Sequence, residues 1–137
     1  MDQNKISLKL VNNSDHEFLY DLLKNRNPDF NISHKKMPSF KEHVKFVNSN
    51  PYSKWYIIKQ NNKKIGSIYL SKQNEIGIFL MKNVQGQNIG TKILKLLITK
   101  TPRKRFLANI NPNNKKSIKF FKKNGFKLIQ YTFELEK

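Results

Sequence analysis

Residues 83–97, NVQGQNIGTKILKLL, constrain the fold more than any other part of this sequence. They follow a short apolar run at residues 75–81, EIGIFLM, whose Ile and Phe content predicts a buried strand. Apolar residues then recur at the spacing of one helix face, at Ile89, Ile93, Leu96 and Leu97, whereas the opposite face carries Lys92, Lys95 and Thr99. The pattern predicts a strand that turns through a glycine-containing loop into an amphipathic helix.

A turn of this kind presents backbone N–H groups to an anion. Gly86 and Gly90 relax the backbone limits that a side chain would impose, and the helix that follows directs its positive end toward the loop. The segment therefore predicts a pyrophosphate site. A Walker A loop is excluded because Thr91 and Lys92 follow Gly90 in the wrong order, and a dinucleotide fingerprint would need a third glycine and a distant acid.

The loop Gln85-Gly86-Gln87-Asn88-Ile89-Gly90-Thr91 resembles the acetyl-coenzyme A loop of the GNAT superfamily of N-acetyltransferases. That pattern is Gln or Arg, two free positions, Gly, one free position, then Gly or Ala. Asn88 stands where the family usually has its first glycine, and Asn is the non-glycine residue best suited to left-handed geometry. The resemblance implies acetyl-coenzyme A as co-substrate, bound by all seven loop residues and by Ile78, Phe79 and Leu80 of the preceding strand.

A second block, residues 111–126 (NPNNKKSIKFFKKNGF), resembles the other GNAT signature, an Asn-containing loop that opens a helix ending in Gly-Phe. The resemblance implies that Asn114 and Phe121 contact the cofactor; Asn114 is also suited to capping its own helix. Many family members have a tyrosine at the position of Phe121 that protonates the departing thiolate. A phenyl ring cannot do so, but a thiol with a pKa of about 8.5 is a tolerable leaving group. Tyr131 is an alternative acid, or a packing residue.

The remaining elements fit the same family order. Strands are predicted at residues 7–11, 55–59, 64–70, 106–110 and 126–135, and helices at about 15–25, 39–48 and 115–124. We expect one domain over residues 1–137, of the α+β (α/β) class. The resemblance implies a GNAT-like mixed, mostly antiparallel central sheet with helices on both faces and with strands 4 and 5 splayed apart around the pantetheine arm.

The composition carries a large positive charge. Twenty-seven Lys and Arg against nine Asp and Glu give +18, a field that favours polyanions such as coenzyme A or nucleic acid. The excess is mostly scattered Lys, as compositional drift would also produce. The chain has no Cys and only three His, so we expect no metal site. No apolar run is long enough to span a bilayer, and we expect a soluble cytoplasmic protein, monomeric or homodimeric.

Acetyl transfer to an amine needs a base, because an alkylammonium with a pKa of about 10 is mostly protonated at neutral pH. Glu75 opens the strand nearest the loop and matches the catalytic glutamate of several GNAT branches; the alternative is a surface ion pair with a lysine. The N–H groups around Phe79 and Leu80 would stabilise an oxyanion if that strand is bulged. His43 is interpreted as a surface or boundary residue of a helix. Acceptor contacts are expected at His34, Lys36 and Asn109.

These observations predict an acetyl-coenzyme A-dependent N-acetyltransferase that acts on a primary amine. The segments LLKNRN and SFKEHVKFV are similar to the branch that acetylates amino sugars on nucleotide carriers, and a small amine or a protein amine is the alternative acceptor. The rival class is a basic nucleic-acid-binding module that uses Trp55 and Tyr56 for stacking. A third reading is a GNAT fold that binds the coenzyme without turnover.

Overall fold

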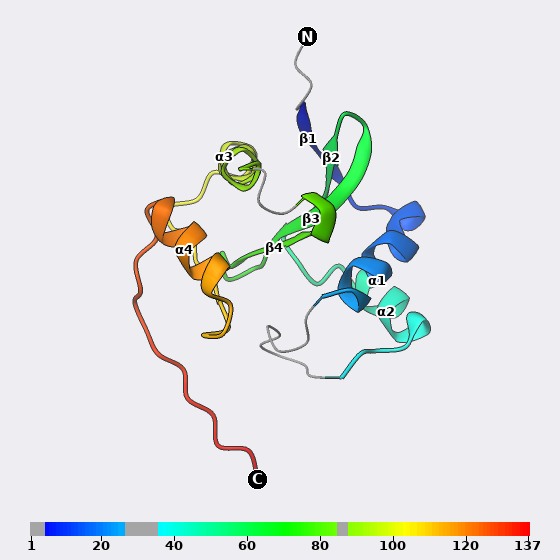
Figure 1. Cartoon of the computed structure of the whole chain (residues 1–137). Helices are drawn as coiled ribbons and strands as arrows, with labels where there is room; N and C mark the ends of the chain where they lie inside the picture. Colours follow the sequence, from blue (N-terminus) through cyan, green and yellow to red (C-terminus); the bar gives the residue numbers. More distant parts are fainter. Residues whose placement is uncertain (1–4, 27–35, 85–87) are drawn as a thin grey trace.

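The centre of the molecule is a four-stranded antiparallel sheet. The computed structural model describes residues 5–26, 36–84 and 88–137. The strands are β1 (Ile6–Leu10), β2 (Lys54–Gln60), β3 (Lys63–Leu70) and β4 (Ile76–Leu80), and they lie side by side in that order (Figure 1). The predicted meander of three antiparallel strands is therefore confirmed for β2, β3 and β4.

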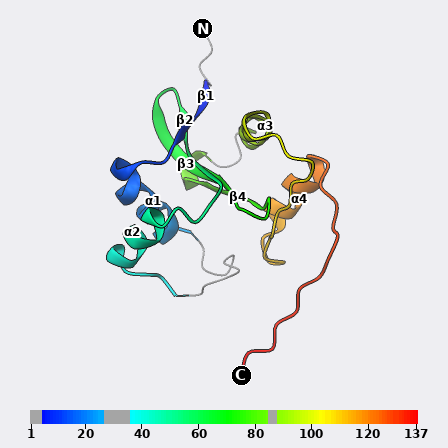
Figure 2. The same ribbon diagram turned by 180° about the vertical axis from the view of Figure 1, so that it is seen from behind.

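Helices cover both faces of this sheet. On one side lie α1 (His16–Lys24), preceded by a short 3-10 turn at Asn13–Asp15, and α2 (Phe40–Asn48). On the other side lie α3 (Gly90–Lys100) and, next to it, α4 (Lys115–Lys123), while a second 3-10 turn, Lys82–Val84, follows β4 (Figures 1 and 2). This arrangement confirms the expected fold class and leaves β4 between the two groups of helices.

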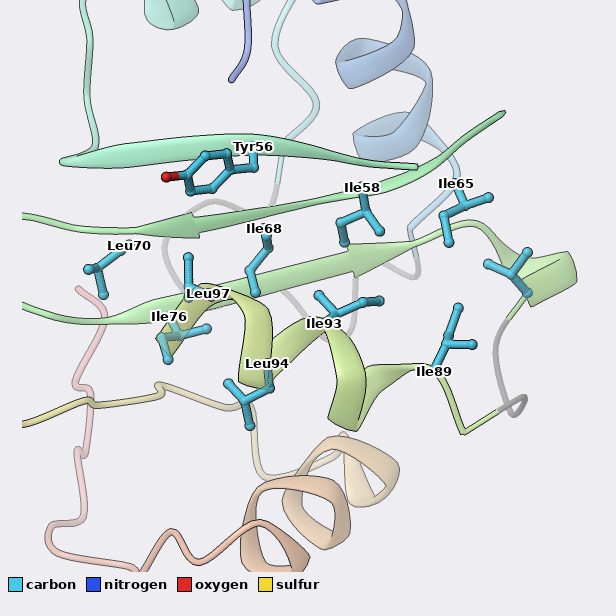
Figure 3. Packing of buried hydrophobic residues seen from close by; sticks show 11 residues of the cluster. Tyr56, Ile58, Ile65, Ile68, Leu70, Ile76, Ile89, Ile93, Leu94 and Leu97 are labelled. Carbon is cyan, nitrogen blue, oxygen red and sulfur yellow. The ribbon is translucent and has the colours of Figure 1, made fainter. Parts of the chain in front are cut away.

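Successive side chains of a strand point to opposite faces of the sheet, and this alternation explains why the molecule has two apolar layers. Ile58 and Ile68 face α3 and pack with its buried residues, including Ile93, Leu94 and Leu97 (Figure 3). Ile57, one residue away from Ile58, points to the opposite face and packs with Leu19 of α1 and Val47 of α2. The α3 cluster is the larger of the two, so α3 is held firmly with its first turn beside the end of β4.

Local capping and turn signals in the sequence are found in the structure. Ser39 and Glu42 form a reciprocal capping box, in which Ser39 Oγ accepts from Glu42 N at 3.1 Å and Glu42 Oε1 accepts from Ser39 N at 2.9 Å. Asn61 and Asn62 have φ of 51° and 69°, as a tight hairpin turn requires. Gly125 ends α4 with φ of 92°.

Two predicted strands are wrong. Within residues 106–110 only Leu107 forms a β-bridge, parallel to Glu75. Residues 126–135 form no strand; they leave the body as an extended tail in which Phe133 is 91% exposed and Tyr131 76% exposed (Figure 1). Their alternating apolar pattern suits a strand, but a strand needs a neighbour for its backbone hydrogen bonds, and no described segment lies along this tail.

Candidate active site

A gap lies between β4 and the segment that follows Leu107. Ile76 N donates to Leu107 O at 2.7 Å, and Leu107 N donates to Asn74 O at 2.8 Å. In the described residues no further backbone hydrogen bond joins β4 to residues 108–110, so the two segments part after a single bridge. The predicted splay between the fourth strand and the segment after α3 is therefore present, and it begins at Glu75.

The backbone of β4 directs polar groups into this gap. Because Ile76 N–H points outward to Leu107, strand alternation also points the N–H groups of Ile78 and Leu80 outward. Phe79 N–H points the other way, toward Ser67 on β3. The pairing of β3 with β4 has a continuous register, so the bulge considered for this strand is not there; a register shift lies instead between Ile58 and Lys59 of β2. Ile78 and Leu80, rather than Phe79, thus carry amides toward the gap.

The first turn of α3 supplies a second set of N–H groups. Gln85, Gly86 and Gln87 lie outside the described residues, but Asn88 has φ of 59°, the left-handed conformation that its chemistry predicted. Ile93 N donates to Ile89 O at 3.0 Å, so the amides of Gly90, Thr91 and Lys92 precede the first helical hydrogen bond. The first turn contains no acidic residue. These groups fit an anion such as a diphosphate.

Close packing holds this turn in place. A Cβ atom at Gly90 would come within 2.8 Å of a Phe120 ring atom, so α3 and α4 meet at a point that only a glycine allows without adjustment. The exposed lysines of α4, at positions 115, 116, 119, 122 and 123, lie on the rest of that helix. The first turn of α3 is thus packed closely against α4.

Asn114 and Phe121 both have structural roles. Asn114 is the N-cap of α4, and its Oδ1 accepts from Ser117 N at 3.3 Å. Phe121 is 7% exposed and packs edge-on against Phe120 and Phe126, with ring centroids 5.1 and 5.0 Å apart. Contact of either residue with the cofactor stays a prediction.

Glu75 lies at the mouth of the gap with both carboxylate oxygens engaged. Ser71 Oγ donates to Glu75 Oε1 at 3.1 Å, and the Asn109 side-chain amide donates to Oε2. Ser71 Oγ also accepts from Glu75 N at 3.0 Å, so the serine hydroxyl contacts both the backbone and the side chain of Glu75. Glu75 is half-buried and forms no ion pair in the described part of the chain, and its role as a base stays a prediction.

Aromatic residues and an arginine surround the same face of β4. Gly77 stands opposite Tyr69 of β3, and a Cβ atom there would lie 2.2 Å from the Tyr69 ring. Tyr69 stacks on Tyr52 with centroids 3.8 Å apart, and Phe79 has the Arg26 guanidinium 4.3 Å from its ring centroid. Burial raises the pKa of the Tyr69 hydroxyl, as it does that of Tyr52. This wall extends from Glu75 toward the end of α1.

Two of the three predicted acceptor residues lie in the described part of the chain, one beside Glu75 and the other just before α2. Asn109 contacts Glu75, the predicted base, and its contact with an acceptor stays a prediction. Lys36 is exposed just before α2, where its charge lowers the pKa of Glu42 after the larger effect of the Ser39 hydrogen bonds. His34 lies outside the described residues. Sequence reasoning missed Ser71 and Arg26 because neither carries a motif. Ser71 contacts Glu75 across the short turn between β3 and β4, whereas Arg26 contacts Phe79, which is distant in the chain.

His43 differs from its expected surface position. Its ring is 5% exposed and lies 5.5 Å from that of Tyr20, between α1 and α2. Burial lowers the pKa of His43, with a further contribution from His16. A shallow hollow of about 310 Å³ lies near this helix pair, between the end of β1 and the end of α2, but neither Glu75 nor any gap residue lines it.

The sequence model of the Acetyltransferase (GNAT) family matches residues 16–126. The chain therefore belongs to the GNAT family of acetyltransferases. The resemblance to the GNAT superfamily is therefore confirmed, whereas the branch that acetylates nucleotide-linked amino sugars is not shown.

Individual relatives agree with this assignment. The peptidyl-lysine N-acetyltransferase YjaB of Salmonella typhimurium is 27% identical over 74 residues, which are 54% of this chain and 50% of that protein, so the chain spans about half the length of the curated relatives it matches. A domain from Methanocaldococcus jannaschii DSM 2661 superposes with a TM-score of 0.82 and 29% identity, over 96% of this chain and 94% of that one. Spermidine N-acetyltransferase from Vibrio cholerae, solved in complex with CoA and spermine, has a TM-score of 0.73 and 17% identity over 88% and 79%.

Residues 5–26, 36–84 and 88–137 can also be searched for metal-binding groups and for membrane-spanning helices. They contain no group of three or more His, Cys, Asp or Glu side chains arranged to hold a metal ion. No helix among them combines the length and the apolar character needed to cross a bilayer.

Proposed function

We propose that this protein transfers an acetyl group from acetyl-coenzyme A to a primary amine, with Glu75 as the base. The observation that carries the proposal is the position of the Glu75 carboxylate, which Ser71 and Asn109 hold at the point where β4 and the segment after Leu107 separate. A proton acceptor at the mouth of a gap with outward-facing amides is what an aminolysis reaction needs.

Each part of the site has a defined task in this reaction. When bound, the coenzyme supplies a thioester carbonyl carbon, to which the amine nitrogen bonds while the carbon–sulfur bond breaks. The first turn of α3 binds the diphosphate through its amides, and the outward N–H group of Ile78 lies on the strand beside the gap. Glu75 takes the proton that the amine loses, directly or through a water. The thiolate leaves without a tyrosine partner, since Phe121 is buried among rings.

For the acceptor, we propose an amino sugar on a nucleotide carrier. The protein is strongly positive, at +18, which favours a negatively charged acceptor over a polycationic one. The relatives leave this choice open, because one is named for peptidyl-lysine and another was solved with spermine. A small amine or a protein amine is the competing acceptor, and the rival role as a nucleic-acid-binding module predicts steeply salt-dependent binding to DNA without affinity for the coenzyme.

Two measurements test the proposal. Calorimetry with acetyl-coenzyme A should give saturable binding, and thioester consumption should rise when an amine panel of amino sugars, polyamines and lysine peptides is added. The role of Glu75 is tested with Glu75→Gln. Its matched control is Glu42→Gln, because Glu42 is an exposed carboxylate in a capping box on α2. Binding without consumption for any amine would contradict catalysis, and salt-sensitive DNA binding without coenzyme binding would favour the rival.

A further inference from the structure

The extended tail, residues 126–135, is attached to the body of the molecule only at its base. Phe126 N donates to Phe121 O at 3.0 Å, and the Phe126 side chain packs against the larger apolar cluster. The residues after Phe126 are exposed and run clear of the sheet and the helices (Figures 1 and 2). The position of the tail is therefore fixed where it begins, while the rest of its surface lies open to solvent.

The side chains of the tail have the alternation of a strand. Tyr131 and Phe133 are two positions apart, and their rings stack with centroids 6.3 Å apart, so they share one face. Gln130 and Thr132 share the other face, where the Gln130 amide donates to Thr132 Oγ1 at 3.3 Å. The apolar face consists of four side chains that are 63–91% exposed: Ile129, Tyr131, Phe133 and Leu135. A continuous exposed apolar surface of this kind is typical of an interaction site.

A matching strand edge lies on the segment 106–110, which we call the edge segment. Leu107 donates its N–H to Asn74 and accepts from Ile76 N, so its backbone groups point toward β4. Strand alternation therefore turns the backbone groups of Phe106 and Ala108 away from β4. Among the residues that the structure describes, no backbone hydrogen bond reaches either of these two. The outer side of the edge segment can thus pair with one more strand.

Charge favours antiparallel pairing of the tail with the edge segment. Three exposed cations, Arg103, Lys104 and Arg105, come directly before the edge segment. The tail has a cation, Lys127, near its beginning and an acid, Glu134, near its end. Antiparallel pairing puts Glu134 beside the three cations, whereas parallel pairing would put Lys127 there and bring like charges together.

The connection within one chain has the opposite effect. The edge segment and the tail are joined through α4, and a connection through a helix joins neighbouring strands in parallel. If the tail paired with the edge segment of its own chain, the pairing would therefore be parallel, with like charges adjacent. The antiparallel pairing that the charges favour needs the edge segment of another copy.

We propose that two copies of this chain form a dimer by exchanging tails, each tail pairing antiparallel with the edge segment of the other copy. The exchange is reciprocal, so it closes on two copies related by a twofold axis. It covers four exposed rings, two from each tail, and a buried ring removes about 150–250 Å² from solvent. With the aliphatic side chains and the surface that they cover, the interface reaches the roughly 1,200–2,000 Å² of a stable complex. The inference is independent of acetyl transfer.

The first test measures the mass of the protein in solution. Sedimentation of the parent over a series of concentrations should give the mass of two chains. Phe133→Asp places a charge on the apolar face and should raise the dimer dissociation constant about 100-fold or more, whereas Thr132→Asp, on the polar face, should raise it about 3-fold at most. Because Phe133 is 91% exposed in the single chain, its replacement should leave a folded monomer, which circular dichroism would verify.

Three results would overturn the proposal. A parent that is monomeric at every concentration would leave the tail to its own chain or to another protein. A dimer that Phe133→Asp does not weaken would use a different surface. An assembly of more than two copies would contradict reciprocal exchange.

The second test uses the charges to check the direction of pairing and the exchange between copies. Glu134→Lys and Arg105→Glu each bring like charges together at both contacts of the dimer, so each should weaken it about 10-fold. A mixture of the two variants should recover the affinity of the parent, because opposite charges meet at both contacts of the mixed dimer. Contacts within one chain would gain nothing from mixing. An absence of recovery would therefore overturn antiparallel exchange.

Discussion

The side-chain amide of Asn109 donates a hydrogen bond to Glu75 across the gap between β4 and the segment after Leu107. The two residues are 34 positions apart and approach each other because a single parallel bridge, Glu75 with Leu107, sets the distance between their segments. With Ser71 on the other oxygen, the carboxylate is held in one orientation. A base held in this way needs little rearrangement to accept a proton.

We expect Glu75→Gln to lower kcat by about 10²- to 10⁴-fold, the usual contribution of a general base, with little change in acetyl-coenzyme A binding. The amide keeps the shape, but its single oxygen can accept from only one of Ser71 and Asn109, and it cannot take a proton. Stopped-time thioester assays across pH would measure the change. Unchanged turnover would remove Glu75 from the mechanism.

Ser71→Ala and Asn109→Ala should each lower kcat by roughly 3- to 10-fold, because each removes one hydrogen bond that orients the carboxylate. The KM for acetyl-coenzyme A should stay constant. The informative measurement combines either change with Glu75→Gln. If these residues act through Glu75, the double variants will be no slower than Glu75→Gln alone; additive losses would mean an independent role.

Gly77→Ala should destabilise the protein by about 1–3 kcal/mol, since the new methyl group would overlap the Tyr69 ring at 2.2 Å. Chemical denaturation of the parent and the variant would give this difference. A matched variant, Gly77→Ala with Tyr69→Leu, removes the overlapping ring and should recover part of the loss. A stable single variant would show that the Tyr69 ring can move, and the rigid wall beside Glu75 would be refuted.

Asp15 should make stability depend on pH in the acid range. Its side chain is fully buried beneath Lys64 and Lys9, with oxygen to nitrogen distances of 2.7 and 3.1 Å. Burial raises the pKa of Asp15, but the hydrogen bonds from Lys64, Asn12 and Lys9 outweigh it, and the net pKa lies below 3.8. A lowered folded pKa means that this stability is present above pH 4 and is lost as the pH falls through the folded value.

Asp15→Asn is therefore expected to cost about 1–3 kcal/mol near pH 7 and progressively less toward pH 3. Thermal unfolding at several pH values would measure this. Asp21→Asn, an exposed residue on α1, is the control and should follow the parent curve. Parallel curves for the parent and Asp15→Asn would contradict the assigned role.

Several elements could be predicted from the linear sequence because their signals are local. The capping box of Ser39 and Glu42, the hairpin at Asn61 and Asn62, and the left-handed Asn88 follow from contacts within a few residues. Their energies do not depend on the rest of the fold, so they can be found in a linear pattern. The loop motif likewise indicated the family.

The composition of the candidate site depends on contacts that no linear pattern marks. The contacts of Asn109 with Glu75 and of Arg26 with Phe79 join segments that are distant in the chain, whereas Ser71 meets Glu75 across a short turn that no sequence motif marks. The tail after Gly125 fails as a predicted strand for the same reason, because its apolar alternation matches a sheet but pairing needs a second segment. A sequence pattern states what a segment can bury, whereas the partner and the geometry depend on how the whole chain packs.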